Sequence, residues 1–354
     1  MEINITPAQP GQLKAKPDEN ALGFGASFSD HMFTMRYEGG QWHSPAITPY
    51  GDFMLDPAAM VLHYGQAIFE GLKAYRGKDD ATYLFRPKDN LARFNRSAKR
   101  MCMPEVDIDL VFAGISQLLE LDRAWVPSAP GASLYIRPTM VATEAGLGVR
   151  PAKEYLFFTI LSPVGAYYPE GFNPVKIFVT EKYVRAVRGG VGEAKTAGNY
   201  AASIMAAVEA QSQGFTQVLW LDACDRQSVE EVGTMNIFFV INDEIVTPPL
   251  SGSILPGITR ESVLQLCRDQ GRTVRERPIT IDEVFTANES GQLQEVFGTG
   301  TAAIISPVGS LFFQGRECQV NGGNTGPLAQ QLFDDLQGIQ YGYQPDSYNW
   351  VTTV

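Results

Sequence analysis

The alternation of apolar and polar residues predicts short strands and helices of mixed kind in the first half of the chain. Strand-like segments occur at residues 82–85 and 133–136, and a longer apolar run covers residues 155–161. Apolar positions with a helical period predict a helix over residues 90–101. The polar face of that helix consists of Arg93, Arg96, Lys99 and Arg100. We therefore expect a first mixed α/β block that ends with the apolar run.

A second block is predicted after a stretch with turn-forming composition. Residues 162–174 contain three prolines and two glycines, which is typical of an interdomain connection. Beyond it, strands are predicted at residues 175–180, 217–221 and 237–241, and a helix at residues 200–211. Thr280 to Glu283 reads as a capping box at a helix start, in which hydroxyl and carboxylate each bind a free amide.

These blocks predict a two-domain protein of the α+β or mixed α/β class. We expect a flexible N-terminal arm over residues 1–20 and a smaller α/β domain over residues 21–163. The interdomain connection is predicted at residues 164–174, and a larger domain over residues 175–354. The 354 residues, 44% of them hydrophobic, are enough for two packed cores.

Charge and composition narrow the classes of partner. The net charge of −11 disfavours non-specific binding to nucleic acids or anionic membranes, so small molecules or further copies of the chain are the expected partners. The four cysteines and three histidines lack metal-ligand spacing, which predicts reduced thiols and no metal site. We find no secretion signal and no long apolar segment, and expect a cytoplasmic protein without membrane insertion.

Lys195 is the first candidate for chemistry. It follows the glycine-rich stretch 188–194 and precedes a helix, so a flat ligand can approach the backbone closely. Partial burial lowers the pKa of a lysine, which lets the free amine attack a carbonyl. The alternatives are a solvated loop lysine or a nucleotide site, because Gly189 to Thr196 nearly matches the P-loop pattern. However, Ala194 stands where that pattern requires glycine.

Two further segments can bind a phosphate group. The turn at Pro256 and Gly257 leads into a helix whose first free amides belong to Ile258 and Thr259, and the helix dipole favours an anion there. The loop 298–303 offers successive backbone amides and the hydroxyls of Thr299 and Thr301. Two anion sites and one reactive lysine are typical of a cofactor pocket.

Glu231 is the candidate for the remaining part of such a cofactor. Glu230 and Glu231 precede an apolar strand, so at least one carboxylate is expected to be buried and to need a cation or hydrogen bonds. Pyridoxal 5'-phosphate would supply a protonated ring nitrogen for the carboxylate, a phosphate for the anion sites and an aldehyde for the lysine. One ligand would thus explain all three features, although a surface glutamate or a helix cap is the alternative.

The ordered motifs of the chain resemble those of the branched-chain amino acid aminotransferases, which are fold-type IV pyridoxal-phosphate enzymes. The motifs are residues 24–32 (FGASFSDHM), 63–71 (HYGQAIFEG), 85–87 (FRP), 133–138 (SLYIRP), 195–200 (KTAGNY), 231–236 (EVGTMN), 255–260 (LPGITR) and 297–302 (FGTGTA). The similarity extends from about Gly23 almost to the C-terminus.

The resemblance implies a role for each candidate residue. Lys195 would carry the pyridoxal phosphate as a Schiff base, Glu231 would pair with the pyridine nitrogen, and Tyr200 would bind the phenolic oxygen. The residues implied for the phosphate are Arg93, Ile258, Thr259 and Thr301, and those for the substrate are Phe24, Tyr64, Tyr135, Arg137, Thr234 and Ala302.

The implied reaction is reversible transfer of an amino group from Leu, Ile or Val to 2-oxoglutarate, giving a branched 2-keto acid and glutamate. The resemblance also implies a homodimer in which the partner lends a loop near residues 147–149. Within the same fold, a D-amino acid aminotransferase or an aminodeoxychorismate lyase would use the same lysine and glutamate with different pocket residues.

Overall fold

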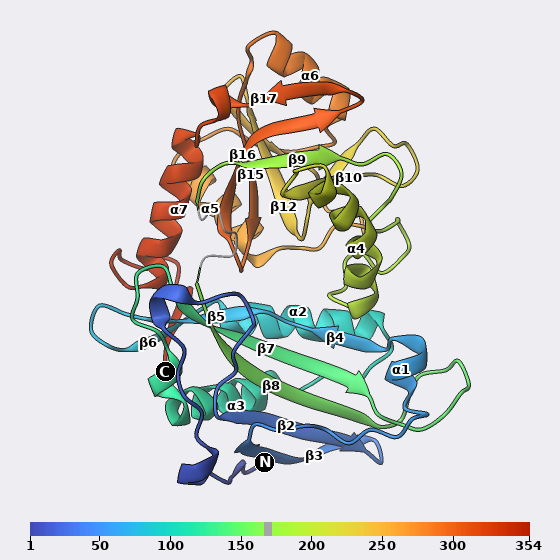
Figure 1. The fold of residues 1–354 in the computed structure, drawn as a ribbon, viewed down its shortest axis with the longest axis vertical. Coiled ribbons are helices and arrows are strands. Elements are labelled where there is room, and N and C mark those ends of the chain that lie inside the picture. Colours follow the sequence, from blue (N-terminus) through green and yellow to red (C-terminus); the bar gives the residue numbers. More distant parts are fainter. Residues whose placement is uncertain (166–171) are drawn as a thin grey trace. The chain divides into compact units, whose positions relative to one another are not determined.

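The computed structural model describes residues 1–165 and 172–354 and divides the chain into two compact units (Figure 1). The first unit contains Met1–Tyr167, Ala194–Ala197 and Gln337–Val354, and the second contains Tyr168–Glu193 and Gly198–Leu336. Lys195 thus belongs to the first unit and Glu231 to the second. No helix among the described residues has the length and apolar character needed to cross a membrane.

The first unit is built on a mixed sheet with nine strands in the described residues. Its path is β1-β3-β2-β8-β7-β5-β6-β18, and β4 pairs with β7. The strands are β1 (Asn4–Ile5), β2 (His31–Glu38), β3 (Gln41–Pro49), β4 (Ala67–Phe69), β5 (Leu72–Arg76), β6 (Thr82–Phe85), β7 (Ser133–Ala142), β8 (Tyr155–Val164) and β18 (Val351–Thr353). The C-terminal strand β18 therefore returns to this sheet beside β6.

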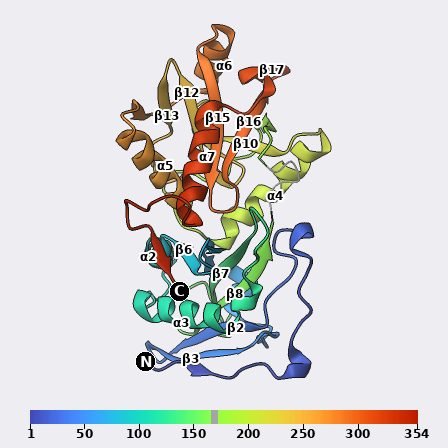
Figure 2. The same ribbon diagram turned by 90° about the vertical axis from the view of Figure 1, so that its left-hand side faces the viewer.

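Helices cover this sheet with their apolar faces. They are α1 (Met60–Tyr64), α2 (Pro87–Arg100) and α3 (Ile108–Leu121). In α2, Leu91, Phe94 and Ala98 recur at helical spacing and are fully buried in the core, whereas the last turn is basic. Figure 2 shows α3 alongside β2 and β3, which it contacts.

The second unit contains another mixed sheet with nine strands in the described residues. Its path is β11-β10-β9-β16-β15-β12-β13-β14, with β17 on β16, and β12, β15 and β16 run close together in Figure 2. The strands are β9 (Val175–Val179), β10 (Gln217–Leu221), β11 (Val229–Val232), β12 (Met235–Ile241), β13 (Glu244–Thr247), β14 (Val274–Glu276), β15 (Leu293–Gly300), β16 (Ile304–Phe313) and β17 (Arg316–Gln319). Every residue of β12 is buried, so this strand is covered on both faces.

The helices of the second unit carry several candidate site residues. They are α4 (Ala197–Ser212), α5 (Ile258–Asp269), α6 (Ile281–Glu289) and α7 (Pro327–Gln340). Ala206 and Ala210 of α4 pack on Val218 and Trp220 of β10, which holds the helix against the sheet. Tyr200 lies in the first turn of α4, and Ile258 and Thr259 begin α5.

The structure confirms the mixed α/β fold class and every helix and strand predicted from the sequence, with boundaries that differ by a few residues. The predicted interdomain connection at residues 164–174 includes residues 166–171, which lie outside the described residues. The capping box is only half present. Thr280 caps α6 through the amide of Glu283, but the Glu283 carboxylate accepts hydrogen bonds from Arg277 instead, because this cation offers a charge-assisted pair.

Candidate active site

Lys195 lies beside strand β4 in the first unit. Its carbonyl oxygen accepts a hydrogen bond from the Phe69 amide at 3.0 Å, and Thr196 forms a bridge to Ile68. The side chain is half-buried, with Nζ 5.0 Å from the centroid of the Phe69 ring. The glycine-rich loop therefore delivers the amine to an aromatic surface, where a cation is favoured over the ring face.

Arg93 is held within the same unit by a buried carboxylate. Its Nε lies 2.7 Å from Glu70 Oε1 and its Nη2 lies 2.9 Å from Glu70 Oε2, which is a bidentate pair. Asn90 contributes a longer contact of 3.5 Å to Nη2. Glu70 follows β4 directly, so this short strand leads from the Lys195 contact into the Arg93 contact. The plane of the guanidinium is fixed before any ligand arrives.

An aromatic and cationic cluster surrounds Phe69. The rings of Phe24 and Tyr135 meet edge to face at 5.0 Å, and Arg137 donates to the Tyr135 hydroxyl at 3.3 Å. The Arg137 guanidinium also lies 4.8 Å from the Phe69 ring centroid. Gly71 is required beside this cluster, because a Cβ there would lie 1.8 Å from the Tyr135 hydroxyl oxygen. The structure thus brings Phe24, Tyr135 and Arg137 together.

Tyr64 has a different environment from these substrate candidates. It ends helix α1, is 40% exposed, and its hydroxyl donates to the carbonyl of Leu147. Leu147 and Val149 are themselves exposed apolar side chains. Tyr64 therefore belongs to an apolar surface of the first unit.

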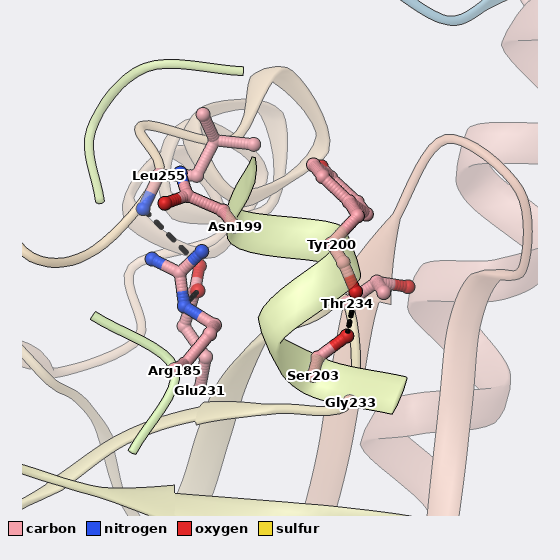
Figure 3. Close-up of a pocket in the computed structure, with 8 residues that line it drawn as sticks. All are labelled: Arg185, Asn199, Tyr200, Ser203, Glu231, Gly233, Thr234 and Leu255. Carbon is pink, nitrogen blue, oxygen red and sulfur yellow. Dashed lines mark hydrogen bonds and ion pairs between the residues drawn. The ribbon is translucent and has the colours of Figure 1, made fainter. Parts of the chain in front are cut away.

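In the second unit, Glu231 is buried and paired with a cation. Figure 3 shows Arg185 against the Glu231 carboxylate, and the two side chains are 8% and 4% exposed. Glu231 Oε1 also accepts hydrogen bonds from Asn236 Nδ2 at 3.0 Å and from the Leu255 amide at 3.2 Å. This environment satisfies the demand for a cation and hydrogen bonds that the sequence placed on the carboxylate, and it favours the ionised form.

Tyr200 and Thr234 line the pocket that contains Glu231 (Figure 3). The pocket is lined by Arg185, Asn199, Tyr200, Ser203, Glu231, Gly233, Thr234 and Leu255. Ser203 donates to the Tyr200 carbonyl at 2.7 Å, and Asn199 donates to the Val191 carbonyl at 2.8 Å. The first turn of α4 is thereby attached to the loop that precedes Lys195 in the chain.

The predicted phosphate-binding segments have the expected backbone form. Helix α5 begins at Ile258 after the N-cap Gly257, and Ile258 and Thr259 are buried. A side chain at Gly257 is excluded, because its Cβ would lie 2.0 Å from Asn236 Oδ1. Thr301 lies in the turn between β15 and β16, where it is half-buried. The same Asn236 that binds Glu231 therefore packs against the start of this helix.

Sequence reasoning missed three residues that position the site. Arg185 was noticed only as part of a charged segment that argued against a buried P-loop strand, and Phe69 and Glu70 were noticed only as motif letters. A signal for Glu70 was available, since an acidic residue between apolar strands needs a cation. The identity of that cation required the tertiary structure, because Arg93 lies on a separate helix.

Comparison with known proteins identifies the family. The amino-transferase class IV family matches residues 67–311, which is more than half of the chain. The chain belongs to this family. It is therefore a class IV aminotransferase, and the enzymatic nature expected from the motifs is confirmed.

Individual relatives agree with the family assignment. Branched-chain-amino-acid aminotransferase 2 of Bacillus subtilis is 54% identical over 342 residues, which cover 96% of this chain and 94% of that protein. The crystal structure of the Escherichia coli branched-chain amino acid aminotransferase matches with a TM-score of 0.76 and 27% identity, over 91% of this chain and 98% of that chain. The resemblance drawn from the motifs is thus confirmed.

One solved structure of this group is described with a cofactor form. It is a branched-chain amino acid aminotransferase from T.th., with pyridoxamine 5'-phosphate, and it matches with a TM-score of 0.75 and 27% identity, over 90% of this chain and 97% of that chain. The fold of this class IV aminotransferase is therefore one that holds a pyridoxal-derived cofactor in a relative.

Proposed function

We propose that this class IV aminotransferase transfers the amino group of Leu, Ile or Val to 2-oxoglutarate, with pyridoxal 5'-phosphate as cofactor. The observation that carries the proposal is the 54% identity to a branched-chain-amino-acid aminotransferase over 96% of the chain. At this identity and coverage, no domain difference separates the two chains. The products would be the branched 2-keto acid and glutamate.

The residues present fit pyridoxal 5'-phosphate by the chemistry of their donors and acceptors. Lys195 offers a primary amine for a Schiff base with the aldehyde, and Glu231 offers a buried carboxylate for the ring nitrogen. Tyr200 would bind the phenolic oxygen. The phosphate would be held by Arg93, the amides of Ile258 and Thr259, and Thr301.

The chain's own residues account for the proton movements of the reaction. When bound, the cofactor supplies an electron-withdrawing ring that stabilises negative charge at the substrate Cα. Lys195, once displaced by the substrate amine, removes the Cα proton as general base and returns it as general acid. Glu231, kept ionised by Arg185, holds the proton of the ring nitrogen. Oxidation of the amino acid is balanced by reduction of the keto acid in the second half-reaction.

The proposed substrate pocket combines apolar walls with one cation. Phe24 and Tyr135 provide aromatic surface for a branched side chain, and Arg137 beside Tyr135 can pair with a carboxylate. Such a pocket can accept both a branched amino acid and glutamate. The other substrate residues that we propose are Tyr64, Thr234 and Ala302.

We also propose that the protein works as a homodimer. Leu62, Tyr64, Leu147 and Val149 in the first unit are 60%, 40%, 66% and 86% exposed, and such apolar side chains gain from being covered by a second copy. Sedimentation equilibrium of the holoenzyme is expected to give twice the chain mass. A monomer at micromolar concentration would contradict this part of the proposal.

Absorbance spectroscopy tests the cofactor assignment directly. The purified protein with pyridoxal 5'-phosphate is expected to show the Schiff-base band near the visible edge, and Lys195→Ala is expected to lose both the band and turnover. A wild-type protein that binds ATP with magnesium and shows no such band would favour the nucleotide alternative. The structure disfavours that alternative, because the Thr196 hydroxyl donates to the Ala67 carbonyl at 2.8 Å rather than being presented to a metal.

A substrate panel separates the remaining fold-type IV activities. Reaction of L-leucine, L-isoleucine or L-valine with 2-oxoglutarate, measured as glutamate formed, supports the proposal. Exclusive reaction with D-alanine would indicate a D-amino acid aminotransferase, and pyruvate released from aminodeoxychorismate would indicate a lyase.

A further inference from the structure

The peptide groups around Lys195 are engaged by two different elements of the first unit. On one side, the Lys195 carbonyl accepts from Phe69 at 3.0 Å, and the Thr196 hydroxyl donates to the Ala67 carbonyl at 2.8 Å. On the other side, the Lys195 amide donates to the hydroxyl of Ser97 at 2.9 Å. The first two contacts end on backbone atoms of β4, whereas the third depends on a side chain of α2.

Ser97 has no other evident reason to be polar. It is 1% exposed, and it lies in the middle of the apolar face of α2, between Phe94 and Ala98. A buried hydroxyl costs free energy unless it is hydrogen-bonded. In a helix such a hydroxyl commonly bonds to the carbonyl four residues earlier, but here it accepts a hydrogen bond from the lysine loop.

The position of Ser97 on α2 relates it to the phosphate candidate. Arg93 lies four residues earlier, one helical turn away on the same face, and is fixed by Glu70, which follows β4. The short strand β4 and helix α2 therefore form one frame. That frame holds the backbone of Lys195 and the guanidinium of Arg93 together.

We infer that Ser97 is a positioning residue for Lys195. Its buried hydroxyl fixes the amide of the lysine, and this sets the direction in which the side chain leaves the backbone. A small rotation of this peptide is amplified at Nζ, at the far end of the side chain. The inference rests on the proposed role of Lys195 as the cofactor lysine and deepens it by naming the residue that aligns the amine.

The inference differs from a purely structural role in its consequences. A serine that only fills space would affect unfolding when replaced, but it would leave the chemistry of the lysine unchanged. A serine that aligns the lysine controls how fast Nζ reaches the aldehyde of the cofactor, because misplacement by about 1 Å can cost about 100-fold in rate.

The test compares Ser97→Ala and Ser97→Thr with the wild-type chain. Apoprotein is mixed with pyridoxal 5'-phosphate, the appearance of the Schiff-base band is followed, and the band of the holoenzyme is then titrated with pH. We expect Ser97→Ala to slow Schiff-base formation by about 10-fold and to shift the midpoint of the pH titration. Ser97→Thr keeps the hydroxyl and is expected to restore both.

A matched control comes from helix α3 of the same unit. The Ser116 hydroxyl bonds the Phe112 carbonyl at 3.0 Å, so Ser116→Ala removes a helical serine without touching the lysine loop. This variant should match the wild type in rate and midpoint. Thermal unfolding of all variants shows how much of any effect is loss of fold.

Wild-type rate and midpoint in Ser97→Ala would overturn the inference, whatever happens to its unfolding temperature. Equal slowing in Ser97→Ala and Ser97→Thr would overturn it as well, because the hydroxyl would then not be the responsible group. Absence of the Schiff-base band in the wild type would instead reject the proposed function, so the two failures are distinguishable.

Discussion

Glu70 and Arg93 form a bidentate ion pair in which both side chains are almost completely buried, 0% and 4% exposed. The pair joins the segment after β4 to α2 and engages Nε and one terminal nitrogen of the guanidinium. Burying two charges is costly, and such a pair contributes little net stability compared with an apolar pair of the same size. Its value therefore lies in the orientation that it gives to the arginine.

Arg93→Lys tests whether this orientation serves the phosphate. Lysine keeps the charge, but it cannot form the planar fork with Glu70. We expect the dissociation constant for pyridoxal 5'-phosphate to rise by roughly 10-fold or more, because a hydrogen bond to a charged group contributes about 1.5–3 kcal/mol. The affinity for pyridoxal, which lacks the phosphate, should not change. Fluorescence titration of apoprotein measures both.

Glu70→Gln provides the second half of this experiment. If Glu70 acts through Arg93, the double variant should bind pyridoxal 5'-phosphate no more weakly than Arg93→Lys alone, apart from the loss of fold. Equal weakening of pyridoxal and pyridoxal 5'-phosphate in the single variants would show that the pair supports only the fold.

Arg185→Gln is expected to slow the half-reaction with L-leucine. The guanidinium pairs with the Glu231 carboxylate, so its removal leaves the carboxylate less favourably ionised and less able to hold the ring proton. Loss of a charge-assisted contact of this kind predicts about a 10- to 100-fold lower rate. Single-turnover spectroscopy measures this rate, and Glu231→Gln should slow it further while the cofactor still binds.

Arg188→Gln is the matched control for this prediction. Arg188 belongs to the same charged segment, is 60% exposed and pairs with Asp222 at 3.2 Å. Its replacement should leave the half-reaction unchanged. The same rate in all three proteins, wild type, Arg185→Gln and Arg188→Gln, would remove Arg185 from the explanation of Glu231.

Local patterns explain why the elements could be predicted from the sequence. The run Gln217 to Leu221 forms β10 with the predicted bounds, and the turn at Gly257 begins α5 at Ile258 as its free amides required. Each of these signals depends on residues close together in the chain. The sequence could also indicate that Glu231 needs a cation, because the cost of an unpaired buried carboxylate does not depend on the fold.

The cation itself could not be predicted, because charge complementarity has no fixed spacing along a chain. Arg185 and Glu231 meet only after β9 and β10 have paired and the loop after β9 has folded back. Glu283 shows the same limit in the opposite direction. Its spacing from Thr280 favoured a reciprocal cap, but Arg277 competes for the carboxylate at 2.5 and 3.1 Å.

Lys73 predicts an unusual dependence of stability on pH. This residue of β5 is 5% exposed, and burial lowers its pKa to about 8. Between about pH 8 and 10.5 the unfolded chain therefore binds the proton and the folded chain does not, so the free energy of unfolding should rise with pH. Over two pH units the gain is on the order of 2 kcal/mol. Urea denaturation at several pH values measures it.

Lys73→Met should flatten this dependence and raise stability at neutral pH, because methionine carries no charge to desolvate. Tyr75 limits the window from above. Burial raises its pKa, so the folded chain keeps this proton longer and stability falls again once the unfolded tyrosine ionises near pH 10. An identical slope between pH 8 and 10 in both proteins would contradict the assignment.

Glu295 is expected to stabilise the second unit by capping α7 from a neighbouring strand. Its two carboxylate oxygens accept hydrogen bonds from the amides of Leu328 and Ala329, at 2.8 and 2.9 Å, in the first turn of the helix. Glu295→Gln places an amide donor against one of these donors and removes the charge that complements the helix dipole. We expect a loss of about 1–3 kcal/mol. Differential scanning calorimetry should show a lower unfolding temperature for Glu295→Gln, whereas Glu317→Gln, at an exposed position on β17, should unfold like the wild type. Equal unfolding temperatures for both variants would mean that the buried carboxylate does not support the helix.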